Sequence, residues 1–551
     1  MYDNYAVMKT VATILLERKL LSRDDLSKAE RIARRERQSL TAVLLDQNVV
    51  AETDLLQLLA GHQGLAFVDL KETAIAREAI DAVSAKLVSH YGVMPVTLDD
   101  GVLTIAVSDP LDMSPAEDIE TNLGYQVERV VACRGDIREA LRKHYGVGAE
   151  TVEKILADSP GRVEVAPLEE SHDLEKMAED ASVVRLVNQL LQQAINERST
   201  DIHFEVYRDG VVVRRRIDGI LYDTSVPKKI RLLYPAMVSR VKLMSGLNIV
   251  ERRLPQDGRA RITIGRREFD LRVSVVPSIH GEDVVIRILP STMIFDLAHL
   301  GFSEAHLEAV ESLIAEPNGI LFVTGPTGSG KSTTLYACMS RLNSRERKLI
   351  TIEDPVEYEL RGVTQTQVNP RIGLTFAAAL RSMLRHDPDV ILVGEVRDRE
   401  TADIAVQTAM TGHLVLSTLH TNDAAGGAVR LIDMGVDPYL ITSTVRVFMA
   451  QRLVRVICGD CRESYMSEGR MLYRGSGCRR CNNSGFRGRM AICEFLPLTP
   501  DIQDLILRKT SAKDIRKKAD ALGMTTMFED GMRKVARGLT TEAEVLRVTT
   551  T

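Results

Sequence analysis

The sequence predicts an α/β protein that is divided into several domains. Its 551 residues exceed the roughly 250 to 300 residues at which a single hydrophobic core stops growing. An apolar strand at residues 319–324 leads through a glycine-rich turn into a helical run, an order typical of α/β folds. Hydrophobic residues make up 44% and charged residues 27% of the chain, a balance that excludes a wholly disordered protein.

The N-terminal segment contains a repeat. Leu15–Leu26 (LLERKLLSRDDL) and Leu44–Leu55 (LLDQNVVAETDL) share a pattern at an offset of 29 residues, and each copy is typical of a helix, a turn and a second helix. Ser22 and Ala51 stand where the second helix should begin, and Ser22 is a good N-cap because its hydroxyl can accept a backbone N–H. We therefore expect a helical module over 1–67.

The next segments change in character. Residues 68–145 predict a small α/β module, because the apolar runs VMPVTL and GVLTIAVSD are joined by the hairpin turn Asp99-Asp100-Gly101. Residues 146–180 are rich in Glu, Asp, Gly and Ala without periodicity and are interpreted as a linker. Ser182–Asn196 carries apolar residues at helical spacing, and strands are expected from there to Leu289.

The charge of the chain is uneven. A formal net charge of −5 gives no general attraction to nucleic acid or anionic lipid. Residues 205–289 nevertheless contain 17 Lys and Arg against 10 Asp and Glu. This basic excess requires either an anionic partner or a structural explanation.

The glycine-rich turn, GPTGSGKST at Gly325–Thr333, fits GxxxxGK[ST] and stands between a strand and a helix, as this phosphate-binding motif requires. Backbone N–H groups of such a loop face the phosphates, its lysine reaches the terminal phosphates, and the next hydroxyl binds magnesium. The sequence therefore predicts that ATP and Mg²⁺ are bound by Gly325, Thr327, Gly328, Ser329, Gly330, Lys331, Ser332 and Thr333.

Two acidic elements follow other apolar strands. The strand Val390–Val393 would deliver Glu395 to the carboxyl edge of the sheet, where ligands bind in such folds and where Glu395 can hold the magnesium shell or polarise water. The element TIEDPVEY contains Glu353 and Glu357, either of which could orient the attacking water. Glu357 and Glu395 are the candidate catalytic carboxylates, and a structural role for some of these acids is the alternative.

Four cysteines form two pairs, Cys458-x2-Cys461 and Cys478-x2-Cys481, separated by 16 residues. This is the spacing of a four-cysteine zinc site, and four thiolates leave no open position for catalysis. We therefore predict a structural Zn²⁺, with an iron–sulfur cluster or redox-active pairs as the alternatives. Cys133, Cys338 and Cys493 stand singly in apolar surroundings and are expected in the core.

The sequence offers no membrane anchor of its own. The opening MYDNYAVMKT is unlike a signal peptide, and no apolar run approaches the roughly 20 residues that span a bilayer. We therefore expect a cytoplasmic protein that reaches a membrane only through partners.

Several further motifs occur in order, and together they resemble the secretion ATPase superfamily that powers type II secretion and type IV pilus assembly. The likeness runs from about Ala181 to Phe495. It is carried by LRHDPDVILVGEVRDRETA (384–402), TGHLVLSTLHTNDA (411–424), RLIDMGV (430–436) and QRLVRVIC (451–458), and upstream by STDIHFE (199–205), RRRIDG (214–219), RLPQDGR (253–259) and LRVS (271–274).

The resemblance implies a RecA-like P-loop ATPase domain. It is expected to be preceded by an α+β arginine-bearing domain and by the small N-terminal helical and α/β modules, and to carry a four-cysteine zinc element. The boundaries expected on this basis are 181–290 for the arginine-bearing domain, 300–455 for the RecA-like domain, 456–490 for the zinc element and 491–551 for C-terminal helices.

The resemblance also implies roles for particular residues. TIEDPVEY and TGHLVLSTLHTNDA resemble the family's Asp box and His box, and members of the family act as homo-hexamers in which an arginine-bearing domain closes over the nucleotide. His413 and His420 flank a strand expected beside Glu395 and are candidates to sense the terminal phosphate, with a structural role as the alternative. The candidates to meet the phosphates, where positive charge stabilises phosphoryl transfer, are Arg214, Arg216, Arg272 and Arg287.

A four-cysteine element after QRLVR is a feature of the assembly branch of this family. The N-terminal repeat resembles the extension that docks these motors to their membrane platform or, in some members, binds cyclic di-GMP. The form that binds the dinucleotide has Arg-Leu-Gly at the start of each repeat, whereas Thr10-Val11-Ala12 and Ser39-Leu40-Thr41 stand here. We therefore expect contact with inner-membrane platform and docking proteins in preference to cyclic di-GMP.

The predicted function is that of a cytoplasmic hexameric ATPase, peripheral at the inner membrane, that drives assembly of pilin or pseudopilin filaments. A RecA-like nucleic-acid translocase is the alternative, disfavoured by the charge of −5 and the lack of aromatic stacking motifs. A scaffold that binds ATP without hydrolysing it is a third class, disfavoured by the presence of Lys331, Ser332, Glu357 and Glu395.

Overall fold

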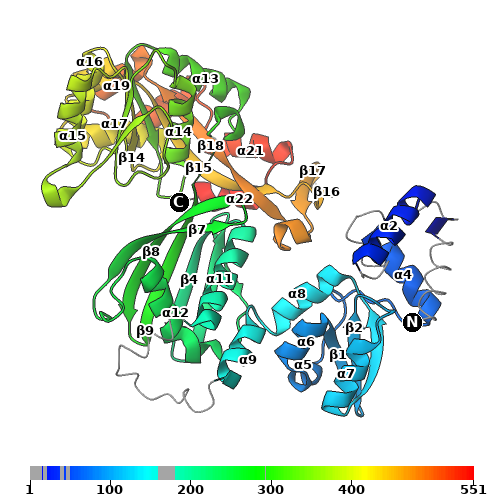
Figure 1. The fold of residues 1–551 in the computed structure, drawn as a ribbon. Helices are drawn as coiled ribbons and strands as arrows, with labels where there is room; N and C mark the ends of the chain where they lie inside the picture. The colour runs from blue at the N-terminus through cyan, green and yellow to red at the C-terminus, as the bar shows by residue number, and fades with distance from the viewer. Residues whose placement is uncertain are drawn as a thin grey trace. The chain divides into compact units, whose positions relative to one another are not determined.

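The protein is described by a computed structural model over residues 15–16, 21–36, 43–44, 50–158, 180–291, 293 and 295–550. The chain divides into two compact units, Met1–Ile262 with Asp270–Leu289 and Thr263–Phe269 with Pro290–Thr551, and Figure 1 colours it from one end to the other. Among the described residues, no helix combines the length and the apolar character that crossing a bilayer would require.

The N-terminal helices α2, Arg23–Glu36, and α4, Glu52–Gln63, fall in the predicted repeat. The Ser22 hydroxyl accepts the Asp25 backbone N–H at 3.1 Å, so Ser22 caps α2 as predicted. The triplets Thr10-Val11-Ala12 and Ser39-Leu40-Thr41 lie outside the described residues. The core of this module includes Leu15, Leu21, Leu44, Leu55 and Leu59.

The small α/β module contains a three-stranded sheet. β1, Met94–Asp99, pairs antiparallel with β2, Val102–Val107, which pairs parallel with β3, Gln126–Val131. Asp100 and Gly101 have φ values of 48° and 84°, the conformation of a two-residue hairpin turn, so the predicted hairpin is confirmed. The helices are α5, Arg77–Ala82; α6, Ala85–Tyr91; α7, Ser114–Leu123; α8, Arg134–His144; and α9, Ala149–Asp158, which opens the predicted linker.

The following domain is a six-stranded sheet in the order β6-β5-β4-β9-β8-β7, and helices α11 and α12 pack on one face of it (Figure 1). The helix predicted at 182–196 is α11, and every apolar position on its predicted face is buried. The bounds are α11, Ala181–Asn196; β4, Ser199–Tyr207; β5, Gly210–Ile217; β6, Ile220–Thr224; α12, Ile230–Met244; β7, Gln256–Ile264; β8, Arg267–Ser278; and β9, Gly281–Pro290.

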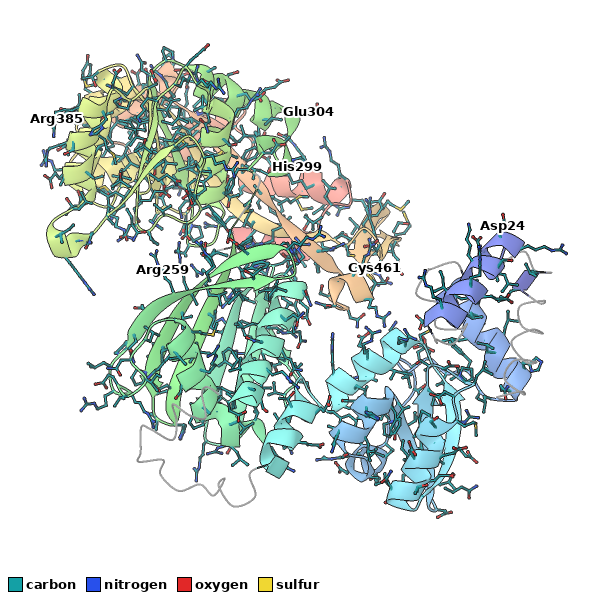
Figure 2. All side chains as sticks on the ribbon, viewed as in Figure 1. Asp24, Arg259, His299, Glu304, Arg385 and Cys461 are labelled. Atoms are coloured by element: carbon teal, nitrogen blue, oxygen red, sulfur yellow. The ribbon has the colours of Figure 1, made fainter. Side chains whose placement is uncertain are left out.

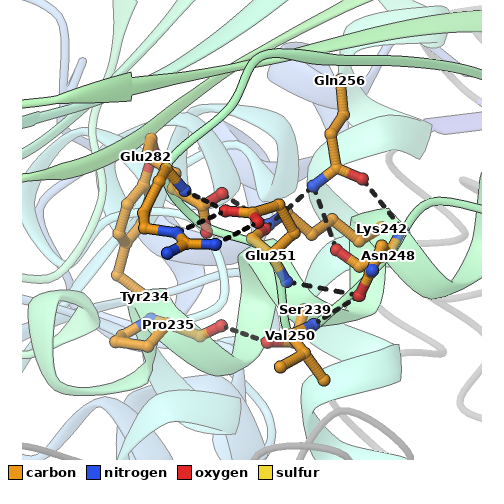
Figure 3. A network of polar contacts seen from close by, with 10 residues as sticks. Tyr234, Pro235, Ser239, Lys242, Asn248, Val250, Glu251, Gln256 and Glu282 are labelled. Atoms are coloured by element: carbon orange, nitrogen blue, oxygen red, sulfur yellow. Dashed lines mark hydrogen bonds and ion pairs between the residues drawn. The ribbon is translucent and has the colours of Figure 1, made fainter.

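A buried lysine fixes the loop that follows α12. Lys242 is 1% exposed, and its ammonium donates to the Glu282 carboxylate and, at 2.7 Å, to the Glu251 carbonyl (Figure 3). The Gln256 amide accepts from the Asn248 N–H at 2.9 Å and donates to the same Glu251 carbonyl at 2.9 Å. Part of the basic excess of this domain therefore has a structural explanation.

The C-terminal unit contains a seven-stranded sheet in the order β12-β11-β13-β14-β10-β15-β18. All neighbouring strands are parallel except β15 and β18. Helices α13 and α14 bury apolar side chains on one face, and α15 to α19 do so on the other (Figure 1). A doubly covered sheet with β10 and β13 at the predicted positions confirms the predicted α/β class.

The bounds in this sheet domain are α13, Glu304–Ala315; β10, Gly319–Thr324; α14, Lys331–Leu342; β11, Leu349–Glu353; β12, Thr364–Gln367; α15, Phe376–Met383; β13, Val390–Val393; α16, Arg399–Met410; β14, Leu414–Leu419; α17, Ala424–Asp433; α18, Pro438–Thr444; β15, Val445–Ile457; and β18, Phe486–Pro497. Short 3₁₀ turns lie at Leu297–His299, Pro370–Ile372, Leu384–His386 and Arg479–Cys481. The C-terminal helices are α19, Pro500–Leu507; α20, Ala512–Ala521; α21, Met527–Ala536; and α22, Glu542–Thr549.

The sheet continues beyond residue 455, the boundary expected from the sequence. β15 runs to Ile457, and β18 returns after the cysteine element to pair antiparallel with it along most of its length. The cysteine element, with its hairpin of β16, Arg462–Ser467, and β17, Arg470–Gly475, is therefore an insertion between the last two strands of the sheet.

Lys242→Met should lower the free energy of unfolding by about 3 kcal/mol, because it leaves the largely buried Glu282 carboxylate without its cation. Arg253→Ala is the control, since Arg253 is 87% exposed in its ion pair with Glu251 and exposed pairs contribute about 0 to 1 kcal/mol. The chain has no tryptophan, so urea unfolding would be followed by far-UV circular dichroism. Equal stability of the two variants would contradict the expectation.

Candidate active site

The glycine-rich loop Gly325–Thr333 joins β10 to α14 as predicted. Gly325 and Gly330 have φ values of 146° and 88°. A Cβ at Gly325 would lie 2.6 Å from the Gln451 carbonyl oxygen, and one at Gly330 would lie 2.8 Å from the Gln451 amide nitrogen. Both backbone conformation and space therefore require glycine at these two positions.

Gln451, from β15, holds the loop in place. Its side chain is buried, donates from Nε2 to the Ser329 carbonyl at 2.8 Å and accepts from the Thr334 hydroxyl at 2.8 Å. The loop and the first turn of α14 are therefore fixed to the same residue of a neighbouring strand. Gln451 lies more than 100 residues from both partners in the chain, so no local pattern in the sequence indicates this role.

Lys331 folds over the loop that precedes it. Its Nζ donates to the carbonyls of Gly325 at 2.7 Å and Pro326 at 3.0 Å. Burial lowers the pKa of the Lys331 ammonium to about 8, while nearby Glu395 raises this pKa and Arg452 lowers it. Ser332 follows the buried lysine and is exposed in the first turn of α14.

Glu395 lies just past β13 at the carboxyl edge of the sheet and is 8% exposed. Its carboxylate pairs with Arg397, and His420 Nε2 lies 3.2 Å from Oε2. His413, in contrast, stands before the first residue of β14, where its Nδ1 is 3.0 Å from the Thr408 carbonyl. A six-residue strand of about 20 Å lies between the histidines, so the structure brings His420, and not His413, to Glu395.

The two glutamates of the element TIEDPVEY differ in burial and in their hydrogen bonds. Glu353 is buried, and its carboxylate accepts from the Tyr336 hydroxyl, from Thr351 Oγ1 at 2.6 Å and from Gln365 Nε2 at 3.1 Å. Three donors on one carboxylate indicate that Glu353 ties β11 to α14. Glu357 is half-buried, and its backbone N–H donates to the same Tyr336 hydroxyl at 3.2 Å, which leaves Glu357 as the candidate from this element.

The four candidate arginines share one face of the six-stranded sheet. Arg216 and Arg287 stand opposite Asp201 on either side in the strand register, and their side chains lie 3.8 and 3.1 Å from its carboxylate. Arg214 pairs with Glu205 at 2.6 Å. Arg272 alternates along β8 with the buried Leu271 and Val273, which places it on the face opposite the helices.

The four predicted metal ligands converge. Their Sγ atoms all lie within 4.8 Å of one another, with 3.8 Å between Cys458 and Cys478, 3.8 Å between Cys461 and Cys481, and 3.7 Å between Cys478 and Cys481. Zinc bound tetrahedrally at about 2.3 Å separates its sulfur atoms by about 3.8 Å, so the donor set fits such an ion. Figure 2 labels Cys461 in this element.

The thiols of the cluster are not equivalent. Burial raises the pKa of Cys461 to about 12. At Cys481 burial also favours the thiol, but hydrogen bonds from the Cys478 and Gly485 backbone lower the pKa to about 7. Sulfur separations near 3.8 Å are far longer than the about 2.05 Å of a disulfide, and all seven cysteines are unbridged. Cys133, Cys338 and Cys493 are buried, as predicted.

Comparison with known proteins shows which family the chain resembles along most of its length. Residues 176–547 match the model of the type II/IV secretion system protein family, and residues 63–151 match the MshEN domain. The type IV pilus assembly ATPase PilB of Myxococcus xanthus is 39% identical over 97% of both chains. The type II secretion system protein E of Xanthomonas campestris is 40% identical over 98% of both chains.

The chain belongs to the type II/IV secretion system protein family. It is an ATPase of the branch that includes type II secretion and type IV pilus assembly proteins, and the resemblance found in the sequence is confirmed. The X-ray structure of the Legionella pneumophila ATPase DotB matches with a TM-score of 0.51 at 23% identity, covering 66% of this chain and 95% of DotB. That likeness shows a shared fold.

Several residues that build the site of this secretion ATPase were not singled out from the sequence. Tyr336, Arg397 and Gln451 contact Glu353, Glu395 and Ser329 respectively. A tyrosine in a helix or a glutamine in a strand carries no local signal of such a role. Of these three residues, Arg397 alone could have been predicted from the sequence, because it follows Glu395 by two residues.

Gln451→Leu should weaken ATP affinity by about tenfold or more, because it leaves the buried Ser329 carbonyl and Thr334 hydroxyl unsatisfied, at about 1 to 3 kcal/mol each. Thr334→Val removes only one of these contacts and should have a smaller effect. The measurement is titration of the full-length protein with a fluorescent ATP analogue. Affinities equal to that of the unmodified protein would show that the loop does not depend on Gln451.

Proposed function

We propose that this secretion ATPase acts as a homo-hexameric motor that hydrolyses ATP with Mg²⁺ and drives assembly of a pilin or pseudopilin filament. The observation that carries the proposal is that the glycine-rich loop with Lys331 follows β10 and Glu395 follows β13, two strands that pair parallel with β14 and therefore end at the same edge of the sheet. Near full-length similarity to a pilus assembly ATPase and a type II secretion protein supports the filament.

In this proposal, each residue of the site has a distinct role in binding or hydrolysing ATP. The backbone of the glycine-rich loop binds the phosphate chain, and Lys331 neutralises its terminal phosphates. Ser332 and Glu395 would hold Mg²⁺, which when bound neutralises negative charge on the phosphates. Glu395 or Glu357 accepts a hydrogen bond from the attacking water and aligns it with the terminal phosphorus. His420, held at Glu395, is the histidine best placed to respond to that phosphate.

The arginine face supplies positive charge in this proposal. Arg214, Arg216, Arg272 and Arg287 would offer guanidinium groups to the phosphates in the hexamer, because positive charge beside the transferred and leaving groups stabilises their negative charge and lowers the barrier. Asp201 and Glu205 hold three of these side chains. These carboxylates orient the guanidinium groups and are exchanged for phosphate when the nucleotide binds.

The cluster of Cys458, Cys461, Cys478 and Cys481 is proposed to bind a structural Zn²⁺. Its Sγ separations support this metal, and the closed set of four thiolates supports a structural role. The bound ion would fix the β16–β17 hairpin relative to the ends of β15 and β18, where the first and last ligands lie.

The cellular setting is proposed from the family. The motor works in the cytoplasm, peripheral at the inner membrane, and contacts platform and docking proteins of the secretion or pilus machine through its N-terminal modules. Residues 63–151 of these modules match the MshEN domain.

Glu395→Gln should retain ATP binding and lose most ATP turnover, whereas Lys331→Ala should lose both. The measurement is Mg²⁺-dependent ATPase activity of the full-length protein, with light scattering to give the mass of the oligomer. Glu357→Gln is the matched comparison, and normal turnover of Glu395→Gln would assign the water to Glu357. Activity that belongs to a monomer and rises with single-stranded DNA would favour the translocase alternative.

Cys461→Ser and Cys478→Ser should each abolish binding of one zinc ion per chain, because three thiolates no longer close the tetrahedron. Metal content would be measured by mass spectrometry on the purified protein. Cys133→Ala, which removes a lone buried thiol, should leave the zinc content unchanged. Iron in the unmodified protein, or no metal at all, would reject zinc.

A further inference from the structure

Arg452 is a buried cation next to the candidate active site. It is 8% exposed, and among the described residues no carboxylate lies within ion-pair distance of it. Its Nη2 reaches the Asn422 carbonyl and side-chain oxygen at 3.5 and 3.4 Å, and its Nε reaches the Val548 carbonyl at 3.4 Å. Its Nη1 is buried and has no hydrogen-bond partner in the described part of the chain.

The other arginines on β15, unlike Arg452, each form an ion pair with a carboxylate. Arg446 lies 2.7 Å from the Glu316 carboxylate, and Arg455 lies 2.7 Å from that of Glu544. A guanidinium stays charged at all relevant pH values, and a buried charge without a counter-ion is strongly unfavourable. The most buried arginine of the strand thus has three long contacts to oxygen atoms, and Glu494 and Asp423 act on it from beyond ion-pair distance, so a bound anion would stabilise its charge further.

The position of Arg452 indicates which anion. β15 runs parallel to β10, and Thr324, the last residue of β10, pairs with Ala450. Arg452 therefore lies two residues beyond the last pair, at the edge from which the glycine-rich loop begins. Asn422, which it contacts, belongs to the loop that carries His420, and the Asp423 carbonyl of that loop accepts from the Thr324 hydroxyl at 3.4 Å.

The charge of Arg452 also acts on Lys331. The charge of Arg452 is near enough to Lys331 to lower the pKa of its ammonium, and Glu395 opposes this effect. Burial likewise lowers the pKa of Arg452 itself, while Glu494 and Asp423 raise it. Two buried cations thus act on one region, and the lysine is the residue that reaches terminal phosphates in loops of this kind.

We propose that Arg452 binds the terminal phosphate group of ATP through Nη1, as a second protein cation beside Lys331. The inference rests on the nucleotide site proposed above and adds a residue to it. Charge-assisted hydrogen bonds from a planar guanidinium to phosphate oxygens are short and directional. The loose contacts to Asn422 and Val548 are then those of a side chain that is held near its ligand without being fixed to protein.

The test compares Arg452→Gln with Arg446→Gln, a paired arginine at the other end of the same strand. Arg452→Gln should weaken the affinity for a non-hydrolysable ATP analogue by about 10-fold to 100-fold, the range for a lost hydrogen bond to a charged group. The affinity for ADP, which lacks the terminal phosphate, should fall by less than about threefold. Both affinities would be measured by calorimetry on full-length protein, where Arg446→Gln should change neither.

Thermal unfolding without nucleotide separates this role from a structural one. Removal of an uncompensated buried charge should leave the midpoint of Arg452→Gln unchanged or raised, whereas Arg446→Gln, which breaks an ion pair, should lower it. A lowered midpoint for Arg452→Gln, together with equal losses for ADP and the ATP analogue, would show that Arg452 only joins Asn422 to Val548 and would overturn the proposal.

Two further outcomes separate this inference from the function on which it rests. Unchanged affinity of Arg452→Gln for the ATP analogue, in a protein where Lys331→Ala abolishes binding, would reject Arg452 and leave the nucleotide site standing. An unmodified protein that binds neither nucleotide would reject the site itself and Arg452 with it.

Discussion

The parallel register of β10, β13, β14 and β15 is the constraint on which the site depends. Parallel strands place their carboxyl ends at one edge, so the residues after Thr324, Val393 and Leu419 meet although they are far apart in the chain. Two hydrogen bonds then align the end of β14 with the loop that follows β13. The Thr418 hydroxyl donates to the Gly394 carbonyl at 2.7 Å, and the Val396 N–H donates to the Thr418 carbonyl at 3.0 Å. Glu395 and His420 are neighbours because these strand ends are aligned.

The return of the chain as β18 connects this edge to the C-terminal helices. Glu494, from β18, is 1% exposed and accepts from the Ala424 N–H at 2.9 Å and the Met527 N–H at 3.4 Å. These N–H groups begin α17 and α21, where helix dipoles favour a carboxylate. Arg516 lies 3.4 Å from the same carboxylate. One buried glutamate therefore joins the loop that carries His420 to two of the last helices, so the insertion that carries the cysteines leaves the sheet domain continuous.

The sequence could predict what local patterns encode. The strand Gly319–Thr324, the Ser22 cap and the hairpin turn at Asp100 each follow from neighbouring residues, and the structure has them where expected. The separation of His413 from His420 could not be foreseen, because it depends on which strand end faces the loop. The roles of Gln451 and Tyr336 were equally out of reach, since each depends on a partner that only the tertiary fold supplies. The family resemblance identified the motifs but not the residues, Gln451 and Tyr336, that hold them in place.

Electrostatics explains why the site is arranged around buried charge. Glu395 is the buried carboxylate that faces Lys331, and it is already engaged by Arg397 and His420. Lys331 and Arg452 are both buried at this edge, and burial of a charge is unfavourable unless an opposite charge lies close to it. In the proposed function, a bound polyphosphate would reverse the sign of this effect, because each buried cation would then have an anion at short range and low dielectric constant. Gln451 holds the glycine-rich loop and the first turn of α14 in place, so in that proposal the cost of burying the cations would favour binding of the nucleotide.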